Sequence, residues 1–154
     1  MIKNETKKII LTIVSIVVVA VLGSVFVNLG ANWFAGLNKP SQWLPDFIIP
    51  IVWTVIYISF SIVLSVWIGK ENLPKSVIVL LVLNGLFNVL WCLMFFALKL
   101  TFIGNVVIVL NLVLAYALIL EIKKYKPIYS LILSVYPIWI SLATTLNLAL
   151  WILN

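Results

Sequence analysis

Residues 9–29 read IILTIVSIVVVAVLGSVFVNL, an apolar stretch that contains no charged side chain. A helix needs ~20 apolar residues to cross the roughly 30 Å of hydrocarbon in a bilayer, so this stretch predicts a transmembrane helix. Lys3, Lys7 and Lys8 precede it, as basic residues precede the apolar core of a signal peptide. The stretch is long, however, and no clear small-x-small cleavage site follows it, so we interpret it as a retained helix.

Further apolar runs long enough to span a bilayer follow along the chain. Of the 154 residues, 65% are hydrophobic and 9% are charged, whereas a soluble domain is roughly 45–50% apolar and about 25% charged. Lipid accepts such a chain only as helices or a closed barrel, and unbroken runs favour helices over strands. We therefore predict an all-α membrane protein, a compact bundle of five transmembrane helices. These helices are expected at about 9–29, 47–68, 76–98, 102–120 and 128–151.

The connections between the apolar runs differ in length. Residues 30–46 form a long first loop, whereas the other links are short, and short links make neighbouring helices antiparallel. No internal repeat is visible, so residues 1–154 are expected to form a single domain. The absence of two matching halves also argues against an inverted-repeat transporter fold.

The basic residues are all lysines, and they lie between the apolar runs. By the positive-inside rule, the side with more lysines is cytoplasmic. The amino terminus is then in the cytoplasm, and the first loop and Asn154 lie outside a membrane that we take to be a bacterial plasma membrane. Lysines that punctuate helices, rather than gather on one soluble face, argue against a nucleic-acid partner. The amino-terminal side carries Lys3, Lys7, Lys8, Lys70, Lys75, Lys123, Lys124 and Lys126, and the other side carries Lys39 and Lys99.

Asparagines and aromatic residues recur at helical spacing in three of the predicted helices. Polar side chains within hydrocarbon tend to face the bundle, so these stripes are expected to converge on its interior. An alternative is that the asparagines join helices by hydrogen bonds and the aromatic rings fill gaps. Trp67 and Trp151 lie near the ends of runs, which favours a place for them in the aromatic belt at the membrane surface. The stripes are Pro50, Trp53 and Tyr57; Asn84, Asn88, Trp91 and Phe95; and Trp139, Ala143, Asn147 and Trp151.

A flat aromatic ligand would account for both the stacking surfaces and the few hydrogen-bond donors, because small-molecule pockets are mostly apolar with a few placed polar groups. The first loop contains Trp33 and Trp43 together with turn-forming glycine and proline. A long apolar loop is typical of a lid over such a pocket, and the alternative is a loop anchored at the membrane surface by its tryptophans.

The chain is poor in groups for other chemistry. No carboxylate, histidine or lysine is expected at mid-bilayer, which argues against proton- or sodium-coupled transport and against ordinary acid–base catalysis. A single cysteine, Cys92, excludes an intramolecular disulfide, and the lack of histidine argues against a protein metal site. Small residues four apart, Ala20 with Ser24 and Ser61 with Ser65, allow tight helix packing or a homodimer.

Three motifs together resemble a known family. The segment WFAGLNKPSQWLP at 33–45, with Trp53 and Tyr57 after it, resembles the signature of the tryptophan-rich sensory protein and translocator protein family. NVLWCLMFF at 88–96 and YPIWISLATTLN at 136–147 are similar to motifs of its third and fifth helices. The resemblance runs from about residue 23 to near the end of the chain. Each motif is weak alone, and their combined spacing is specific.

The resemblance implies a five-helix bundle, often dimeric, that binds porphyrins such as protoporphyrin IX and isoquinoline or benzodiazepine-type ligands beneath the first loop. Two departures are visible: Phe34 replaces a tyrosine usual in the family, and residues 148–154 lack the tyrosine and arginine of its proposed cholesterol motif. By analogy the pocket is lined or closed by Trp33, Trp43, Trp53, Tyr57, Asn84, Asn88, Trp91, Trp139, Ala143 and Asn147.

The leading hypothesis is a membrane receptor or sensor that binds porphyrin as a ligand and needs no obligatory cofactor or metal. Two alternatives remain open. In the first, the protein is an enzyme that degrades bound porphyrin in light, with Trp53 and Trp139 as the catalytic residues. In the second, it facilitates the transport of a tetrapyrrole or a sterol.

Overall fold

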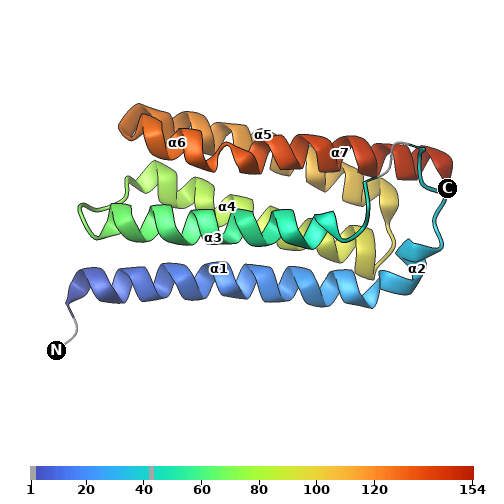
Figure 1. Ribbon diagram of the computed structural model, residues 1–154, viewed down its shortest axis with the longest axis horizontal. Helices are drawn as coiled ribbons and strands as arrows, with labels where there is room; N and C mark the ends of the chain where they lie inside the picture. The colour runs from blue at the N-terminus through green and yellow to red at the C-terminus, as the bar shows by residue number, and fades with distance from the viewer. Residues whose placement is uncertain (1–2, 42–43) are drawn as a thin grey trace.

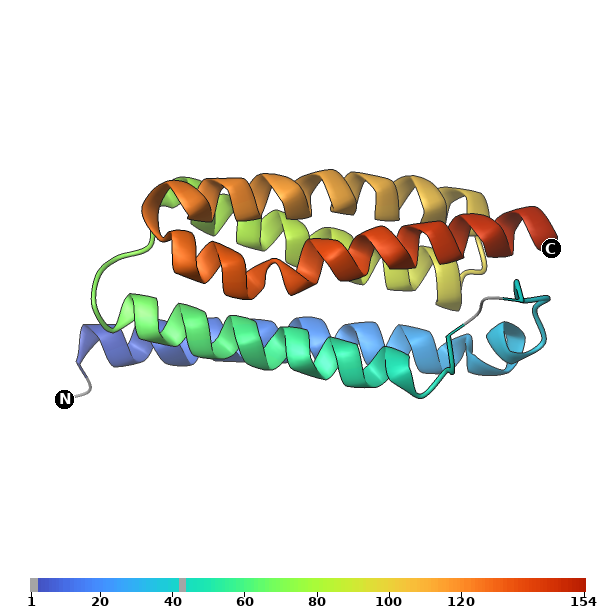
Figure 2. The same cartoon turned by 45° about the horizontal axis from the view of Figure 1, so that its top comes forward.

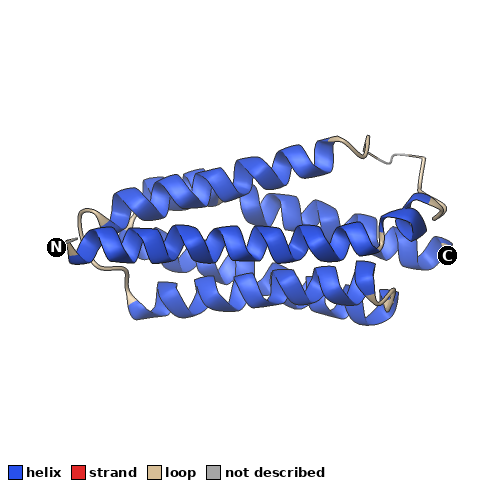
Figure 3. Ribbon diagram, turned by 90° about the horizontal axis from the view of Figure 1, so that it is seen from below, coloured by secondary structure: helices blue, strands red, loops and turns tan. Residues whose placement is uncertain are grey.

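The computed structural model describes residues 3–41 and 44–154, and these residues contain five helical spans that are long and apolar enough to cross a membrane. Figure 1 shows the spans lying side by side. No strand occurs in the described residues, as Figure 3 makes plain, so the prediction of an all-α five-helix membrane protein is confirmed. The spans are α1 (Asn4–Leu29), α3 (Ile48–Ile68), α4 (Lys75–Cys92) with the π-helical turn η1 (Leu93–Ala97), α5 (Thr101–Tyr125), and α6 (Pro127–Leu133) with α7 (Val135–Leu153).

The helices form two layers. In Figure 2, α1 and α3 lie together in one layer, and α4, α5, α6 and α7 lie in the other. Helix α1 contacts both α3 and α4, and Figure 3 shows it in front of these two helices and between them. Gly23 is the one described residue of α1 that is buried, so α1 covers the space between the layers while most of its surface faces outward. The two cavities described below lie between these layers.

Helix boundaries depart from the predicted ones where polar residues extend an apolar run. Helix α1 begins at Asn4 rather than at residue 9, and α5 continues to Tyr125 rather than ending at 120. Lys123 and Lys124 therefore lie in the last turn of α5, where positive charge is favourable to the helix dipole. Hydropathy marks only the part of a helix that meets hydrocarbon, so it misses these polar ends.

The predicted first loop, residues 30–46, is not entirely loop. It contains the short helix α2 (Ala31–Ala35), which starts with a hydrogen bond from the Phe34 amide to the Gly30 carbonyl, 2.9 Å long. Rings of α2 pack on η1: Trp33 meets Phe95 edge-on with ring centroids 5.7 Å apart, and Phe34 lies 5.3 Å from Phe96. These contacts hold α2 across the end of the bundle.

The fifth span is interrupted, whereas the sequence predicted one continuous helix over 128–151. Helix α6 ends at Leu133 and α7 begins at Val135. Pro137 has no amide hydrogen to donate to the carbonyl four residues earlier, which is the usual reason for such a break. The Ser134 amide and hydroxyl both donate to the Leu131 carbonyl, at 3.3 Å and 2.6 Å, where α6 ends.

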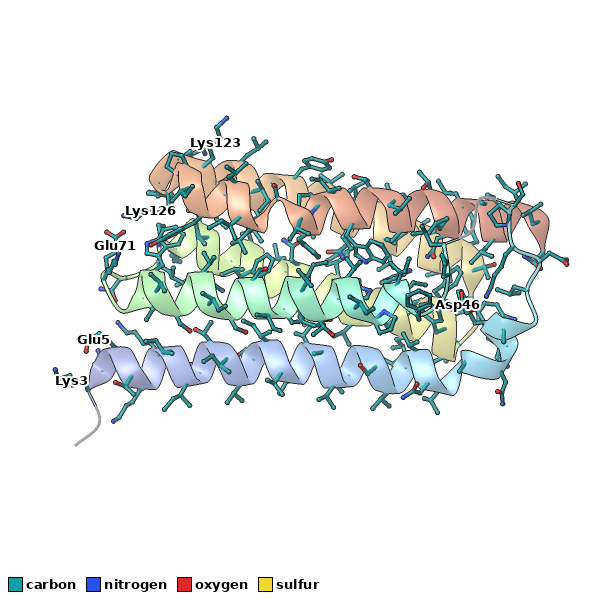
Figure 4. The ribbon with its side chains drawn as sticks, in the orientation of Figure 1. Lys3, Glu5, Asp46, Glu71, Lys123 and Lys126 are labelled. Atoms are coloured by element: carbon teal, nitrogen blue, oxygen red, sulfur yellow. The ribbon has the colours of Figure 1, made fainter. Side chains whose placement is uncertain are left out.

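Charged side chains lie at the ends of the spans. Figure 4 shows Lys3, Glu5, Glu71, Lys123 and Lys126 at the end of the bundle where the chain starts, with Asp46 toward the other end. At the first end Lys126 pairs with Glu71 at 2.6 Å, and its ammonium group lowers the pKa of the Glu71 carboxyl while the carboxylate raises the pKa of Lys126. This arrangement is that of an integral membrane protein; the cytoplasmic location of the amino terminus stays a prediction.

Trp67 corrects one interpretation of the sequence. Its position near a helix end predicted a place in the aromatic belt, but its side chain is only 1% exposed. The indole packs against Tyr129, and its Nε1 donates to Glu71 Oε1 at 3.0 Å. Position along a helix indicates depth in the membrane, and it does not indicate whether a side chain faces lipid or protein. Trp67 lies at the end of the span and faces protein.

Candidate ligand-binding site

Trp53 is the centre of an aromatic cluster that joins three helices. Its ring stacks on Tyr57 of the same helix, with centroids 5.6 Å apart and planes at 26°. It lies 6.2 Å from Trp91 of α4 and 6.4 Å from Tyr136 of α7. Pairs at such separations attract one another beyond the effect of area burial. Rings from α3, α4 and α7 therefore come together around Trp53.

A small chamber lies beside this cluster, beneath α2. Its volume is about 40 Å³, which holds only a few water molecules. Aromatic rings from α2, α3, α4, η1 and α7 form much of its wall. Its lining residues are Phe34, Ile49, Trp53, Trp91, Phe96, Trp139, Ala143, Leu146 and Asn147.

Three residues that line the chamber carry donors without a hydrogen-bond partner among the described residues. They are Trp91 Nε1, Trp139 Nε1 and Asn147 Nδ2, and each of these residues is about nineteen-twentieths buried. A buried donor left without a partner costs free energy, so such groups are usually met by water or by a ligand atom. Three donors at one chamber favour a molecule with several acceptor oxygens or nitrogens.

A larger groove opens on the other side of Trp53. It has a volume of about 1200 Å³ and lies between α1 on one side and α3 and α4 on the other. Tyr57, Asn84 and Asn88 line it, and it extends from Trp53 to Lys8 near the start of the chain. Trp53 belongs to the walls of both cavities. A change in its side chain would thus affect both spaces.

Asn84 also has a structural role. Its Nδ2 donates to the Leu80 carbonyl of its own helix at 2.8 Å and to the Leu114 carbonyl of α5 at 3.1 Å. It therefore connects α4 to α5, as the alternative interpretation of the asparagines proposed. Its Oδ1 is buried and has no partner among the described residues, which leaves one acceptor toward the interior.

The residues predicted for the site fall into separate places. Trp33 lines neither cavity and packs on Phe95 instead. Trp43 lies outside the residues that the structure describes. Phe34, singled out as a departure from the family, lines the chamber with a ring that lacks a hydroxyl. The predicted residues that line a cavity are Trp53, Trp91, Trp139, Ala143 and Asn147 in the chamber, and Trp53, Tyr57, Asn84 and Asn88 in the groove.

Sequence reasoning missed a polar pair in the core. The Tyr136 hydroxyl donates to Oδ1 of Asn111 at 3.2 Å, and Asn88 interacts with the same hydroxyl. Tyr136 lines the groove and is 5% exposed, and Asn111 is fully buried. The sequence could have indicated this pair, because Asn111 lies inside the apolar run of the fourth span. Side-chain amides at mid-bilayer usually hydrogen-bond to another helix.

We expect Tyr136→Phe to lower the free energy of unfolding by about 1 kcal/mol, since it leaves the Asn111 amide without this partner. Thermal unfolding in detergent measures the change. Tyr116→Phe is the matched control, because Tyr116 is exposed and its hydroxyl pairs with Ser141 at the surface. Equal midpoints for the two variants would contradict a stabilising role for the Tyr136 hydroxyl.

The fold and its cavities define a five-span helical membrane protein with a tryptophan-lined interior chamber. The sequence model of the TspO/MBR family matches residues 11–152, and the chain belongs to this family. It is 32% identical to the Tryptophan-rich protein TspO of Chlorobaculum tepidum over 86% of each chain. It is 30% identical to the Tryptophan-rich protein TspO of Archaeoglobus fulgidus, over 96% of this chain and 97% of that one. Protein CrtK of Rhodobacter capsulatus is 28% identical over 79% of this chain and 78% of its own.

Proposed function

We propose that the protein is a membrane receptor that binds a porphyrin, such as protoporphyrin IX, in the chamber beneath α2 and the adjoining part of the groove. The observation that carries this proposal is the set of unpaired donors of Trp91, Trp139 and Asn147 at an aromatic chamber. Flat aromatic rings supply stacking faces, and the donors suit the nitrogens and carboxylates of the ligand. The same aromatic walls suit isoquinoline or benzodiazepine-type ligands, which carry aromatic rings together with nitrogen and carbonyl acceptors.

Binding in this place requires the chamber to expand. About 40 Å³ is far below the roughly 300–1,000 Å³ of typical small-molecule pockets. The adjoining groove has about 1200 Å³ in all, and its part next to Trp53 supplies the space once the side chain of Trp53 turns away from the wall between the two cavities. The ligand then lies across the position of Trp53, with Trp139 on the α7 side and Asn84 and Asn88 on the groove side.

The first loop is proposed to act as the lid. It is held over the chamber by the ring contacts of Trp33 and Phe34 with η1. A second attachment joins Asn38 to Asn154: the Asn38 amide donates to Asn154 Oδ1 at 2.8 Å, and Asn154 Nδ2 donates to the Asn38 carbonyl at 3.1 Å. Loops of this kind open and close over ligands while the helices stay in place.

The test is to fill the chamber. Ala143→Phe places a ring among Trp53, Trp91 and Trp139, and we expect it to weaken porphyrin binding in the dark about tenfold, equal to roughly 1.4 kcal/mol. Quenching of tryptophan fluorescence during titration with protoporphyrin IX in detergent measures the affinity. Leu142→Phe is the control, since Leu142 is exposed on the outer surface and lines neither cavity. Equal affinities for the two variants would place the porphyrin elsewhere.

The same preparation separates the alternatives. Illumination of the complex in air that gives a porphyrin breakdown product, which the Trp53→Phe, Trp139→Phe double variant does not form, would favour the light-dependent enzyme. Counterflow of labelled porphyrin in proteoliposomes would favour facilitated transport. Quenching in the dark without product or counterflow is the result expected of a receptor.

Three further expectations belong to this proposal. The protein lies in a bacterial plasma membrane with its amino terminus in the cytoplasm, and two copies form a homodimer. The porphyrin is a ligand rather than a resident cofactor. Cysteine labelling of Lys3→Cys and Lys39→Cys from either side of sealed vesicles tests the orientation, because these residues precede α1 and follow α2, respectively.

A further inference from the structure

The end of the groove near the start of the chain is a distinct space. It lies between the first turns of α1 and the segment where α3 ends and α4 begins, away from the chamber beneath α2. Its walls are aliphatic, formed by Leu11, Ile68, Leu73 and Ile78. Helix α1 is exposed along most of its length, so this part of the groove opens sideways toward lipid.

The polar hydroxyls in these walls are already paired. Thr12 Oγ1 donates to the Lys8 carbonyl at 2.9 Å, and Ser15 Oγ donates to the Leu11 carbonyl at 2.8 Å. Because both hydroxyls bond their own helix, the wall presents hydrocarbon to whatever fills the groove. An apolar occupant therefore fits this wall better than a polar one.

A lysine and an amide stand at the mouth. Lys8 Nζ of α1 donates to Asn72 Oδ1 of the α3–α4 connection at 2.5 Å, which brings the two sides of the groove together. Among the described residues, no carboxylate lies within ion-pair distance of Lys8. The Asn72 amide therefore positions the Lys8 ammonium group without neutralising its charge. Two further Nζ hydrogens remain for an anion.

The surroundings of the mouth are positive. Lys3 precedes α1 and Lys7 lies next to Lys8 in its first turns, and Lys70 and Lys75 flank Asn72 in the sequence. The acids at this end are fewer. Glu71 pairs with Lys126, Glu121 pairs with Lys124, and Glu5 lies in the first turn of α1. A basic mouth on an apolar groove between membrane helices is the arrangement that binds anionic lipid head groups.

We infer that this end of the groove binds an anionic phospholipid of the surrounding leaflet. The phosphate lies at Lys8 Nζ and the Asn72 amide, and one acyl chain lies between α1 and the ends of α3 and α4. The site is separate from the porphyrin chamber and does not depend on porphyrin binding. The net positive charge at this end of the bundle attracts the phosphate, and the aliphatic wall of the groove contacts the acyl chain.

The test compares two lipids with the same acyl chains. Purified protein is equilibrated with equal amounts of phosphatidylglycerol and phosphatidylcholine in detergent, and bound lipid is counted by native mass spectrometry. We expect the wild type to retain phosphatidylglycerol in preference. Lys8→Gln should reduce that preference about fivefold, which is the effect of one lysine near an anionic surface. Lys70→Gln, which removes a charge from the same end without lining the groove, should leave it nearly unchanged.

Equal losses for Lys8→Gln and Lys70→Gln would overturn the inference, because they would indicate general surface charge rather than a site. Ser15→Phe provides a second measurement, since a ring at this position occupies the groove. It should lower the retention of both lipids, and unchanged retention would also overturn the inference. Porphyrin affinity measured in the dark should stay the same in Lys8→Gln, so a failure here is distinguishable from a failure of the proposed receptor function.

Discussion

Trp53→Ala is expected to weaken porphyrin binding by about 30-fold, which corresponds to the roughly 2 kcal/mol typical of a residue that dominates a binding site. The physical reason is its position. Trp53 stacks on Tyr57, contacts Trp91 and Tyr136, and belongs to the walls of both cavities. Its removal takes away a stacking face for the ligand and merges the two spaces, so the remaining rings lose a neighbour that holds them in place.

The measurement is a dark titration with protoporphyrin IX that follows the absorption of the porphyrin, because each variant lacks a fluorescent tryptophan. Trp151→Ala is the matched control. Trp151 packs on Phe102 near the end of α7, is 43% exposed, and lines neither cavity. We expect its affinity to equal that of the wild type. A loss in Trp151→Ala as large as in Trp53→Ala would indicate that any tryptophan deletion perturbs the protein, and would remove the special role of Trp53.

The number and type of spans were predictable because composition and run length decide them. Residues 9–29 are apolar throughout, and lipid leaves such a stretch no alternative to a helix. The break at Ser134 was not predicted, although Pro137 lies in the sequence, because proline in a membrane helix is accommodated in several ways when neighbouring groups satisfy the freed carbonyls. The outcome depends on packing against other helices.

The π-helical turn η1 was not predicted either, because it too depends on packing against other helices. Phe95 and Phe96 are consecutive and both are buried, whereas a regular helix turns consecutive side chains about 100° apart. The wide turn of η1 brings both rings inward, one against Trp33 and the other against Phe34. The stripe through Asn84, Asn88, Trp91 and Phe95 predicted only the first of these two rings. Wide turns of this type often occur at functional sites.

Helical spacing predicted which faces point inward, and it contained no information on the distances between helices. Trp91, Trp139 and Asn147 were expected to meet in the interior, and they line one chamber. The small size of that chamber depends on how closely α2, α3, α4 and α7 approach one another, and the larger groove depends on the distance of α1 from α3 and α4. The spacing of residues along a single helix does not show how close two helices come, because it indicates only which face of the helix points inward.

Gly30, the residue that follows α1, lies directly against the backbone of η1. A Cβ atom added there would lie 2.3 Å from the carbonyl oxygen of Phe96 and 2.7 Å from its carbonyl carbon. These are backbone atoms of η1, so they cannot turn aside as the end of a flexible side chain would. Gly30 also joins α1 to α2, since its carbonyl accepts the hydrogen bond from the Phe34 amide. Any side chain at this position must push α1 and α2 away from η1.

Gly30→Ala is therefore expected to lower the free energy of unfolding by about 3 kcal/mol and the thermal midpoint in detergent by about 10 °C. Porphyrin affinity should fall in the same variant, because Phe96 and Phe34 line the chamber and would be displaced with the helices. Gly36→Ala is the matched control: the nearest atom to its added Cβ is the Trp33 carbonyl oxygen at 3.5 Å, an ordinary contact, and its φ of −85° suits alanine. If both variants unfold at the temperature of the wild type, the chain at Gly30 does not lie against the Phe96 backbone as closely as these distances require.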